Sequence, residues 1–330
     1  MEIGLYHSCF FEWDVETTFA WMEAEGFSHA ELYGGPRYPF IDWDDVADGR
    51  VDAIMKSAER HGITIHDIMY GALGFLDPEP SVREHAADYL KKLILAAKNL
   101  GASSVSTFTG RDPDLDFEAN LAKIRKTFEP LIEFAAHHGV KVLLENCPMA
   151  HDWPPKYNIA VNPDMWALIF HELDSDYFGL NLDPSHLVWQ GIDYVDAVYR
   201  FRDKIHIAQA KDSQVMTNIQ RTRGTLDGRF WRHRIAGHGD VDWNRFVAAL
   251  VDIGYDKPLF IEHEDPFFSR DTEAVARGVQ ITRQNLLPFA AMTAIGKDYS
   301  ETKEKREEGN REDEENRDGD GNRDGEGIYR

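Results

Sequence analysis

The feature that most constrains the fold is a regular alternation of short apolar runs and longer amphipathic segments over residues 1–290. Eight runs have the length and apolar content of β-strands. They are Ile3–His7, His29–Tyr33, Ile63–Met69, Ser104–Thr109, Val140–Glu145, Tyr177–Asp183, Lys204–Ala210 and Pro258–Glu262. Between them apolar residues recur at three- and four-residue spacing, as in Val82–Leu100 and Phe117–His138, which predicts helices. Strands that alternate with helices predict a parallel sheet with right-handed crossovers.

The number of these units decides between two α/β architectures. Eight strand–helix units within residues 1–290 favour a closed (β/α)8 TIM barrel over an open, doubly wound sheet. A doubly wound nucleotide-binding sheet usually carries a GxGxxG turn after its first strand, and this sequence has none there. We therefore predict one α/β domain, a (β/α)8 barrel over residues 1–290.

The C-terminal segment 297–330 has a different composition from the rest. It consists mainly of Glu, Asp, Arg, Asn and Gly, with 13 acidic and 8 basic residues. Such a segment cannot bury enough apolar surface to offset the entropy lost on ordering. We predict a disordered, low-complexity, acidic tail that contributes nothing to the barrel.

Composition excludes several classes of protein. The 330 residues carry a formal net charge of −22, and an acidic surface repels phosphate backbones, so we expect no nucleic-acid partner. Cys9 and Cys147 are the two cysteines, too few for a disulfide framework or a cysteine-based zinc site. No basic segment precedes an apolar run at the N-terminus, and no apolar run reaches about 18 residues. We expect a cytoplasmic protein without a membrane partner.

Four ionisable residues occur at the positions where a TIM barrel carries its active site, the C-terminal ends of the strands. Strands five, six and eight end in Glu145, Asp183 and Glu262, and strand seven contains His206. The alternation of side chains along a strand allows all four to point into the barrel. Three carboxylates and one imidazole that converge need a cation, and this donor set suits Mn²⁺, Co²⁺, Mg²⁺ or Zn²⁺. The sequence predicts one divalent metal ion bound by these four residues.

Aromatic residues and long loops surround this predicted site. The connections after strands five and seven, Asn146–Asn162 and Lys211–Val241, are long enough to be functional. Five tryptophans follow strand ends, namely Trp13, Trp43, Trp153, Trp189 and Trp231. Because indole faces stack on the C–H faces of sugars, five of them on one rim favour a sugar or polyol ligand.

Four segments carry a resemblance to a known family. LLENCP, LNLDPSHLVWQGID, KIHIAQAKD and FIEHED resemble the strand ends of the sugar phosphate isomerase/epimerase family, in the xylose isomerase-like TIM barrel superfamily. The resemblance covers about residues 1–290 and implies that the four residues named above bind the metal. It also implies that His186 contacts the substrate. It is compatible with a homo-oligomer, since family members often form dimers or tetramers.

The predicted function follows from this site. A divalent ion on two vicinal oxygens of a keto sugar lowers the pKa of the adjacent C–H group. Glu145 and Glu262 would then act as the acid/base pair of an isomerase or epimerase through an enediolate. Substrate would be bound by His186, Asp212, Arg232, Trp13 and His66.

Three other functions stay open at the level of the sequence. A lyase or dehydratase acting on a keto sugar, 3-keto-glycoside or inosose would share the same first step. A non-catalytic sugar-binding protein would keep the fold without the reaction. An endonuclease IV-like nuclease would need further metal ligands and a basic face, and the acidic barrel disfavours it.

Overall fold

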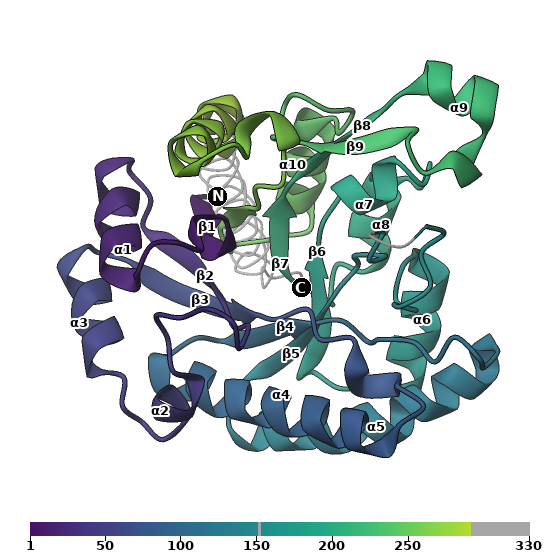
Figure 1. The fold of residues 1–330 in the computed structure, drawn as a ribbon, viewed down its shortest axis with the longest axis horizontal. Coiled ribbons are helices and arrows are strands. Elements are labelled where there is room, and N and C mark those ends of the chain that lie inside the picture. Colours follow the sequence, from purple (N-terminus) through teal and green to yellow (C-terminus); the bar gives the residue numbers. More distant parts are fainter. Residues whose placement is uncertain (151–152, 292–330) are drawn as a thin grey trace, which may run out of the picture.

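The computed structural model describes residues 1–150 and 153–291, so the predicted tail 297–330 lies outside the described residues. Eight parallel strands form a closed barrel in the order β1-β10-β7-β6-β5-β4-β3-β2 (Figure 1). The strands are β1 Ile3–Tyr6, β2 His29–Tyr33, β3 Thr64–Met69, β4 Ser104–Thr107, β5 Lys141–Glu145, β6 Phe178–Leu182, β7 Ile205–Ala210 and β10 Leu259–Ile261. The predicted TIM barrel is confirmed, and each predicted strand lies within two residues of an observed one.

Helices cover the outside of the barrel. They are α1 Val15–Ala24, α3 Asp52–Arg60, α4 Pro80–Leu100, α5 Phe117–His137, α6 Pro163–Glu172, α8 Tyr194–Arg200, α10 Trp243–Asp252 and a helix over residues 272–291, with the shorter α2 Trp43–Ala47 and α7 Ser185–Val188. The local sequence accounts for their ends. In α4, Pro80 supplies the first helical position and Gly101 ends the helix in the left-handed conformation, with φ +73°. No helix among the described residues is both long and apolar enough to cross a membrane.

The long connection after β7 is a folded insertion and not an irregular loop. Its ends form an antiparallel hairpin of β8 Asp212–Val215 and β9 Trp231–Arg234. Between them lie α9 Thr217–Arg223 and a short 3₁₀ turn, Thr225–Asp227. Figure 1 shows this hairpin projecting from the barrel beside β6 and β7.

The barrel interior is layered. Leu143, Ile207 and Phe260 form an apolar layer inside the barrel. Each is followed two residues later by a polar or charged side chain at the strand end, as Leu143 is by Glu145 and Phe260 by Glu262. A buried carboxyl, Glu31 of β2, accepts hydrogen bonds from Asn181 Nδ2 at 2.8 Å and Gln209 Nε2 at 3.1 Å. These bonds tie β2, β6 and β7 together across the barrel.

Two β-bulges change which side chains face inward. The pairing of β6 with β7 places Ile205 opposite Leu180 and Ile207 opposite Asn181, which leaves His206 without a partner. The pairing of β2 with β3 leaves His66 unpaired in the same way, since Ala30 is opposite Ile65 and Glu31 is opposite Asp67. The alternation of side chains shifts by one residue at each bulge. Neither shift is visible in the hydrophobic pattern.

Candidate active site

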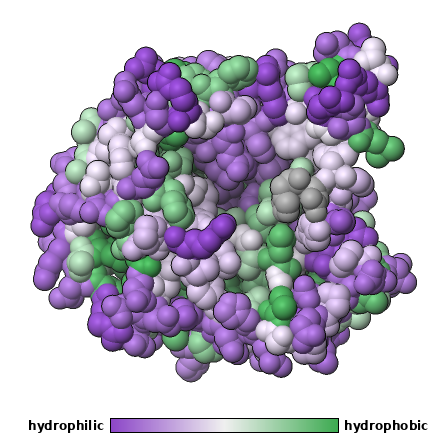
Figure 2. Space-filling view, viewed as in Figure 1, coloured by the Kyte–Doolittle hydropathy of each residue, from purple (hydrophilic) through white to green (hydrophobic). Residues whose placement is uncertain are grey.

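Three carboxylates meet at the C-terminal end of the barrel. Glu145 ends β5, Asp183 follows β6, and Glu262 follows β10. One oxygen from each lies within 4.8 Å of the others. Glu145 and Asp183 are almost fully buried, and the Glu262 side chain is 12% exposed. Figure 2 shows a hollow with a hydrophilic floor in the middle of this face of the molecule.

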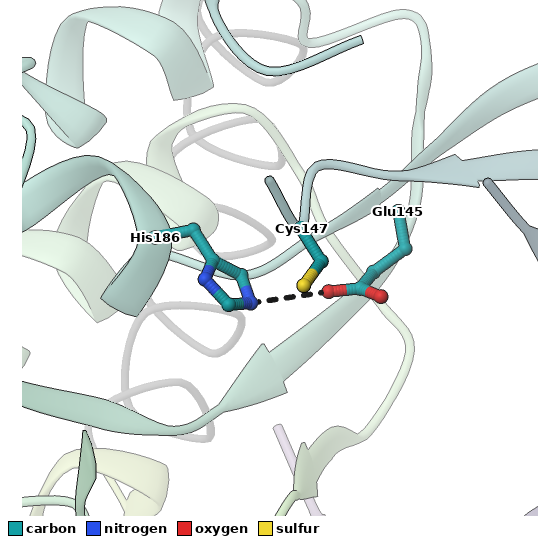
Figure 3. Close-up of side chains that lie close together, drawn as sticks. All are labelled: Glu145, Cys147 and His186. Carbon is teal, nitrogen blue, oxygen red and sulfur yellow. Dashed lines mark ion pairs between the residues drawn. The ribbon is translucent and has the colours of Figure 1, made fainter. Parts of the chain in front are cut away.

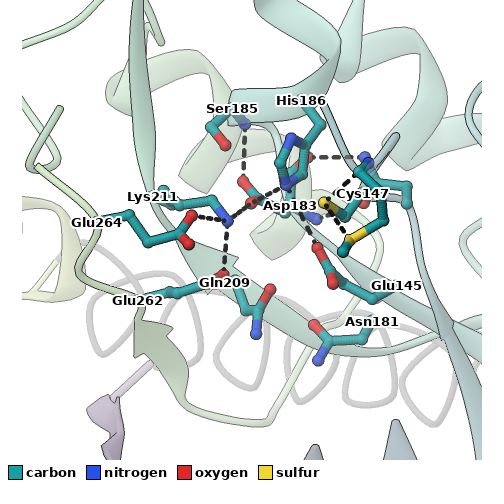
Figure 4. A network of polar contacts seen from close by, with 12 residues as sticks. Glu145, Cys147, Asn181, Asp183, Ser185, His186, Gln209, Lys211, Glu262 and Glu264 are labelled. Atoms are coloured by element: carbon teal, nitrogen blue, oxygen red, sulfur yellow. Dashed lines mark hydrogen bonds and ion pairs between the residues drawn. The ribbon is translucent and has the colours of Figure 1, made fainter. Parts of the chain in front are cut away.

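An ammonium group lies among these carboxylates (Figure 4). Lys211 Nζ is 3.1 Å from Asp183 Oδ2, 2.9 Å from Glu262 Oε2 and 3.0 Å from Glu264 Oε2. Lys211 lies directly after β7 and is 1% exposed. Its position follows from the bulge in β7, because Ile207, Gln209 and Lys211 continue the inward-facing alternation. One positive charge therefore balances part of a larger negative charge.

Burial and charge change the pKa values of these groups in opposite directions. Burial raises the pKa of Glu145 to about 8, and it raises that of Glu262 well above its usual range although Lys211 opposes both shifts. The ammonium of Lys211 lowers the pKa of Glu264 to about 2. Burial alone would lower the pKa of Lys211, but Glu262 and the other carboxylates outweigh it and raise that pKa. The cluster can therefore hold a proton on a carboxyl at neutral pH beside a charged lysine.

His186 supplies a neutral imidazole to the same cluster. Its Nε2 atom lies 3.4 Å from Glu145 Oε1 and 3.2 Å from Asp183 Oδ2, and Cys147 lies beside both Glu145 and His186 (Figure 3). The Asp183-Pro184-Ser185-His186 turn sets this position, since Ser185 N donates to Asp183 Oδ1 at 2.8 Å. Burial, followed by the charge of Lys211, lowers the pKa of His186 to about 4. The ring is neutral at physiological pH and retains a lone pair.

The donor atoms fit a divalent cation. Within residues 1–150 and 153–291, the buried atoms Glu145 Oε1, His186 Nε2 and Gln209 Oε1 make no hydrogen bond. Buried polar atoms normally have partners, so unpaired acceptors directed toward one another indicate a ligand. Glu145, Asp183 and Glu262 would hold the ion, with His186 Nε2 or Gln209 Oε1 as the neutral donor. These are hard oxygen and imidazole donors, as expected for Mn²⁺, Mg²⁺, Co²⁺ or Zn²⁺.

The structure does not bring His206 to this cluster, which corrects the predicted ligand set. His206 is the second residue of β7, near the N-terminal end of the barrel, and its ring lies beside Gly179. Burial lowers its pKa to about 4, with further contributions from Lys141, Lys257 and Lys204. The early position of His206 in β7 keeps it away from the cluster, and the bulge in addition places Ile207 on the inward side of the strand.

His66, expected to bind substrate, lies at the same end as His206. It is the bulge residue of β3, and its Nε2 atom is 2.9 Å from His29 Nδ1. Its ring also packs edge-on against Phe260 in the barrel interior. The C-terminal end of β3 is Met69, so His66 does not face the carboxylate cluster.

The carboxylate of Asp212 is occupied by hydrogen bonds within the protein, contrary to the predicted contact with substrate. Its carboxylate accepts hydrogen bonds from the backbone of Ser213, Gly237, Gly239 and Val241, and from Trp243 Nε1 at 2.9 Å. A Cβ at Gly239 would lie 2.2 Å from Asp212 Oδ1, so only glycine permits this wrapping. The AGHGDVDW segment is therefore a backbone cradle for a buried carboxylate.

Arg232 lies on the face of β9 opposite to the one that approaches the cluster. Its guanidinium donates to Gln214 Oε1 and lies 4.8 Å from the ring centre of Phe267. Side chains alternate along a strand, so Trp231 and His233 occupy the other face. His233 Nε2 is 3.5 Å from Glu264 Oε2, and its ring centre is 5.9 Å from that of His186.

The five rim tryptophans do not form one group. Trp13 stacks on Phe10 with ring centres 4.4 Å apart and also lies near Trp21 of α1, so it packs against α1. Trp43 is buried at the start of α2. The other three, Trp153, Trp189 and Trp231, lie together beside the cluster, with Trp189 and Trp231 stacked at 4.6 Å.

Sequence reasoning missed four residues at or directly beneath this site. They are Lys211, Glu264, His233 and Gln209. The signal for two of them was present: Glu264 is two residues after Glu262, and His233 alternates with the two arginines of WRHR. Lys211 and Gln209 required knowledge of the bulge in β7.

The family comparison agrees with this architecture. The model of the xylose isomerase-like TIM barrel matches residues 19–285. The chain therefore belongs to the xylose isomerase-like TIM barrel family, as its strand-end motifs indicated. One curated relative, the uncharacterized protein YfiH of Bacillus subtilis, is 29% identical over 118 residues. This match covers 33% of the chain and 37% of the relative's length.

Solved structures share the fold at low sequence identity. The 3-keto-D-glucoside 4-epimerase YcjR of E. coli matches with a TM-score of 0.64 and 15% identity, over 86% of this chain and 99% of that one. A probable 3-DHS dehydratase, AsbF of Bacillus anthracis, matches with a TM-score of 0.66 and 15% identity, over 85% of this chain and 98% of that one. The IOLI protein, solved with a bound zinc atom, matches with a TM-score of 0.65 and 19% identity, over 86% of this chain and 96% of that one. At these identities the likeness establishes the fold.

Proposed function

We propose that this protein is a metal-dependent sugar epimerase or isomerase that moves a proton at the carbon next to a keto group. The observation that carries the proposal is the cluster of Glu145, Asp183 and Glu262, whose oxygens lie within 4.8 Å of one another at the mouth of the barrel. Two structural neighbours are in line with it, a 3-keto-D-glucoside 4-epimerase and the IOLI protein with its bound zinc atom.

A divalent ion would supply electrophilic stabilisation of the charge that develops on the keto oxygen. Asp183, with both side-chain oxygens buried, serves only to hold that ion. Glu145 ends β5 and Glu262 follows β10, and β6 and β7 lie between these two strands in the barrel, so the two carboxyls would approach a substrate carbon from different sides. One carboxylate removes the proton and becomes protonated, while the other, protonated beforehand, gives its own proton to the opposite face of the same carbon or to the neighbouring carbon. Exchange of the two carboxyl protons with solvent restores the starting state.

The surrounding residues set the charge of the site. Lys211 places an ammonium beside Glu262 and Asp183. This positive charge offsets part of the negative charge of the metal-binding carboxylates in the buried site. Neutral His186, directed at the same carboxylates, donates or accepts a hydrogen bond at a substrate hydroxyl when it does not serve as a ligand.

The proposal is tested by hydrogen exchange. The purified protein with Mn²⁺ is incubated in D2O with keto sugars, 3-keto-glycosides and inososes, and deuterium uptake at carbon is followed by NMR. The proposal is supported if deuterium enters at one carbon with the wild type and with His206→Gln, but not with Glu262→Gln. Loss of water from the substrate would instead identify a dehydratase, the activity in the name of AsbF. No exchange with any of these compounds would contradict a role in proton transfer.

A further inference from the structure

A cavity of about 530 Å³ lies beside the carboxylate cluster, and the site described above does not use it. Its walls come from four segments outside the strands of the barrel: the loops after β4 and β5, the end of α7 and the β8–β9 insertion. The residues that matter here are Arg111, Trp153, Trp189, Gln190, Gln220 and Phe230. We call it the hairpin cavity. Its volume is within the range of small-molecule sites, about 300–1,000 Å³.

The hairpin cavity adjoins the reacting groups through the chain itself. Pro148 on its wall is three residues after Glu145, and Trp189 is three residues after His186. A series of ring contacts connects the two places: His186 to His233 at 5.9 Å, His233 to Trp231 at 4.9 Å, and Trp231 to Trp189 at 4.6 Å. These shared segments and ring contacts place the cavity next to the carboxylate cluster.

Aromatic rings form one corner of the cavity. The ring centres of Trp153, Trp189 and Phe230 are 5.7–6.2 Å apart in each pairing, and the rings are inclined by 53–73°. The insertion fixes this corner, because Gly228 packs on Trp153 so closely that a Cβ there would be 2.9 Å from the indole. Phe230 and Trp189 are buried, whereas Trp153 is partly exposed, so Trp153 offers the ring face that a ligand can reach and the other two hold it in place. A ring fixed in this way binds a flat apolar face at little cost in side-chain entropy.

Polar residues also line the cavity. Gln190 donates through Nε2 to His186 O and Val161 O, which orients its side chain on the wall. Gln220 of α9 and the guanidinium of Arg111 also line the cavity. Two amides and one cation beside tryptophan faces suit hydroxyl groups on an otherwise apolar ring, whereas a phosphate group generally binds where several cations converge.

We propose that the hairpin cavity binds the second sugar ring of the substrate, so that the enzyme acts on a glycoside or disaccharide derivative and not on a free monosaccharide. This inference rests on the proposed function and names the substrate class for the same site. The ring that reacts lies at Glu145 and Glu262, and the ring that does not react stacks in the aromatic corner.

The test measures binding of sugars that cannot react, so it is independent of turnover. The ligands are methyl β-D-glucopyranoside, cellobiose, maltose and trehalose, titrated by calorimetry into the full chain with Mn²⁺. We expect at least one disaccharide to bind about tenfold more tightly than the monosaccharide glycoside, because stacking on aromatic rings adds a contact of that size. Thr225→Trp, at an exposed wall position, fills the cavity and should abolish this difference.

Thr222→Trp is the matched control, since Thr222 is exposed on the same insertion but does not line the cavity. It should keep the wild-type preference.

Equal affinity for one and two rings in the wild type, no disaccharide binding at all, or a preference that Thr225→Trp leaves intact would overturn the inference. Tight binding of glucose 6-phosphate that Thr225→Trp removes, without a disaccharide preference, would assign the cavity to a phosphate. If deuterium exchanges into monosaccharides but disaccharides bind no more tightly than the monosaccharide glycoside, the proposed function is supported and this inference is wrong.

Discussion

At the C-terminal end of the barrel Asp183, Glu262 and Glu264 surround one ammonium, that of Lys211. At the N-terminal end Lys141 and Lys204 instead donate to the backbone carbonyls of Asp176 and Ser175, between α6 and β6. The first arrangement keeps more acidic groups than cations and leaves buried acceptors unpaired. In the second, both ammonium groups bind backbone carbonyls, and Lys204 also lies 3.9 Å from the exposed carboxylate of Asp174. An excess of buried charge without partners lowers stability, so it is expected only where a ligand supplies what is missing.

The histidines differ between the two ends in the same way. His186 is directed at two carboxylates that would bind a cation. His29 and His66 contact each other, and His29 also contacts Glu2. Function in TIM barrels is located at the C-terminal face and stability at the N-terminal face. The following predictions test this division.

The largest effect is expected for Glu262→Gln. This change keeps the shape of the side chain but removes the charge and the basic oxygen, so turnover at saturating Mn²⁺ should fall ~10²–10⁴-fold. Asp183→Asn should instead lose mainly metal affinity and recover much of its activity as Mn²⁺ is increased. Plots of kcat against Mn²⁺ concentration compare the two. If saturating Mn²⁺ restores the full turnover of Glu262→Gln, Glu262 only binds the metal and does not transfer a proton.

Lys211→Met should destabilise the metal-free protein by about 3 kcal/mol, because it leaves buried carboxylates without their counter-charge. Lys204→Met at the N-terminal end, where the ammonium contacts a backbone carbonyl, is the matched control and should cost less than about 1 kcal/mol. Urea unfolding with and without Mn²⁺ measures both, and added metal should restore part of the loss in Lys211→Met. Equal effects of the two substitutions would remove the distinction between the two ends.

A smaller effect concerns pH and the N-terminal end. Burial, together with His29 and Lys257, lowers the pKa of His66 to about 4, below the value of about 6.5 for an unfolded chain. As the pH falls from 7 to 5 the unfolded state binds a proton that the folded state does not, so stability decreases. His66→Gln should remove about 1 kcal/mol of this decrease. Thermal or urea unfolding at both pH values would show it, and an unchanged pH profile would contradict the assignment.

The smallest effect is expected for His206→Gln, which is therefore the sharpest test of the corrected ligand set. His206 lies beside Gly179, near Lys141, Lys257 and Lys204, so metal affinity and turnover should stay within about twofold of wild type. Calorimetric titration with Mn²⁺ and the exchange assay measure both. A loss of metal binding comparable to that of Asp183→Asn would restore His206 as a ligand.

The sequence by itself determined the barrel and part of its mouth. Apolar runs of strand length, separated by segments of helical period, predicted all eight strands, since each run must be buried between the interior and the helices. The residues at the C-terminal ends of β5, β6 and β10 could be located at the mouth from the strand pattern alone. Glu145, Asp183 and Glu262 accordingly lie together.

Only the tertiary structure decided which side chains of β3, β7 and the insertion face the site. One extra residue in a strand reverses its alternation, and both bulges depend on pairing with a neighbouring strand. The shifted alternation in β7 makes Gln209 and Lys211 face the interior, while His66 and His206 lie at the far end because they come early in their strands. The hairpin that directs His233 and Trp231 inward and Arg232 outward is likewise fixed by long-range contacts, among them the backbone cradle around Asp212. A period of two residues gives alternation along a strand, but its phase is set by partners that are distant in the sequence.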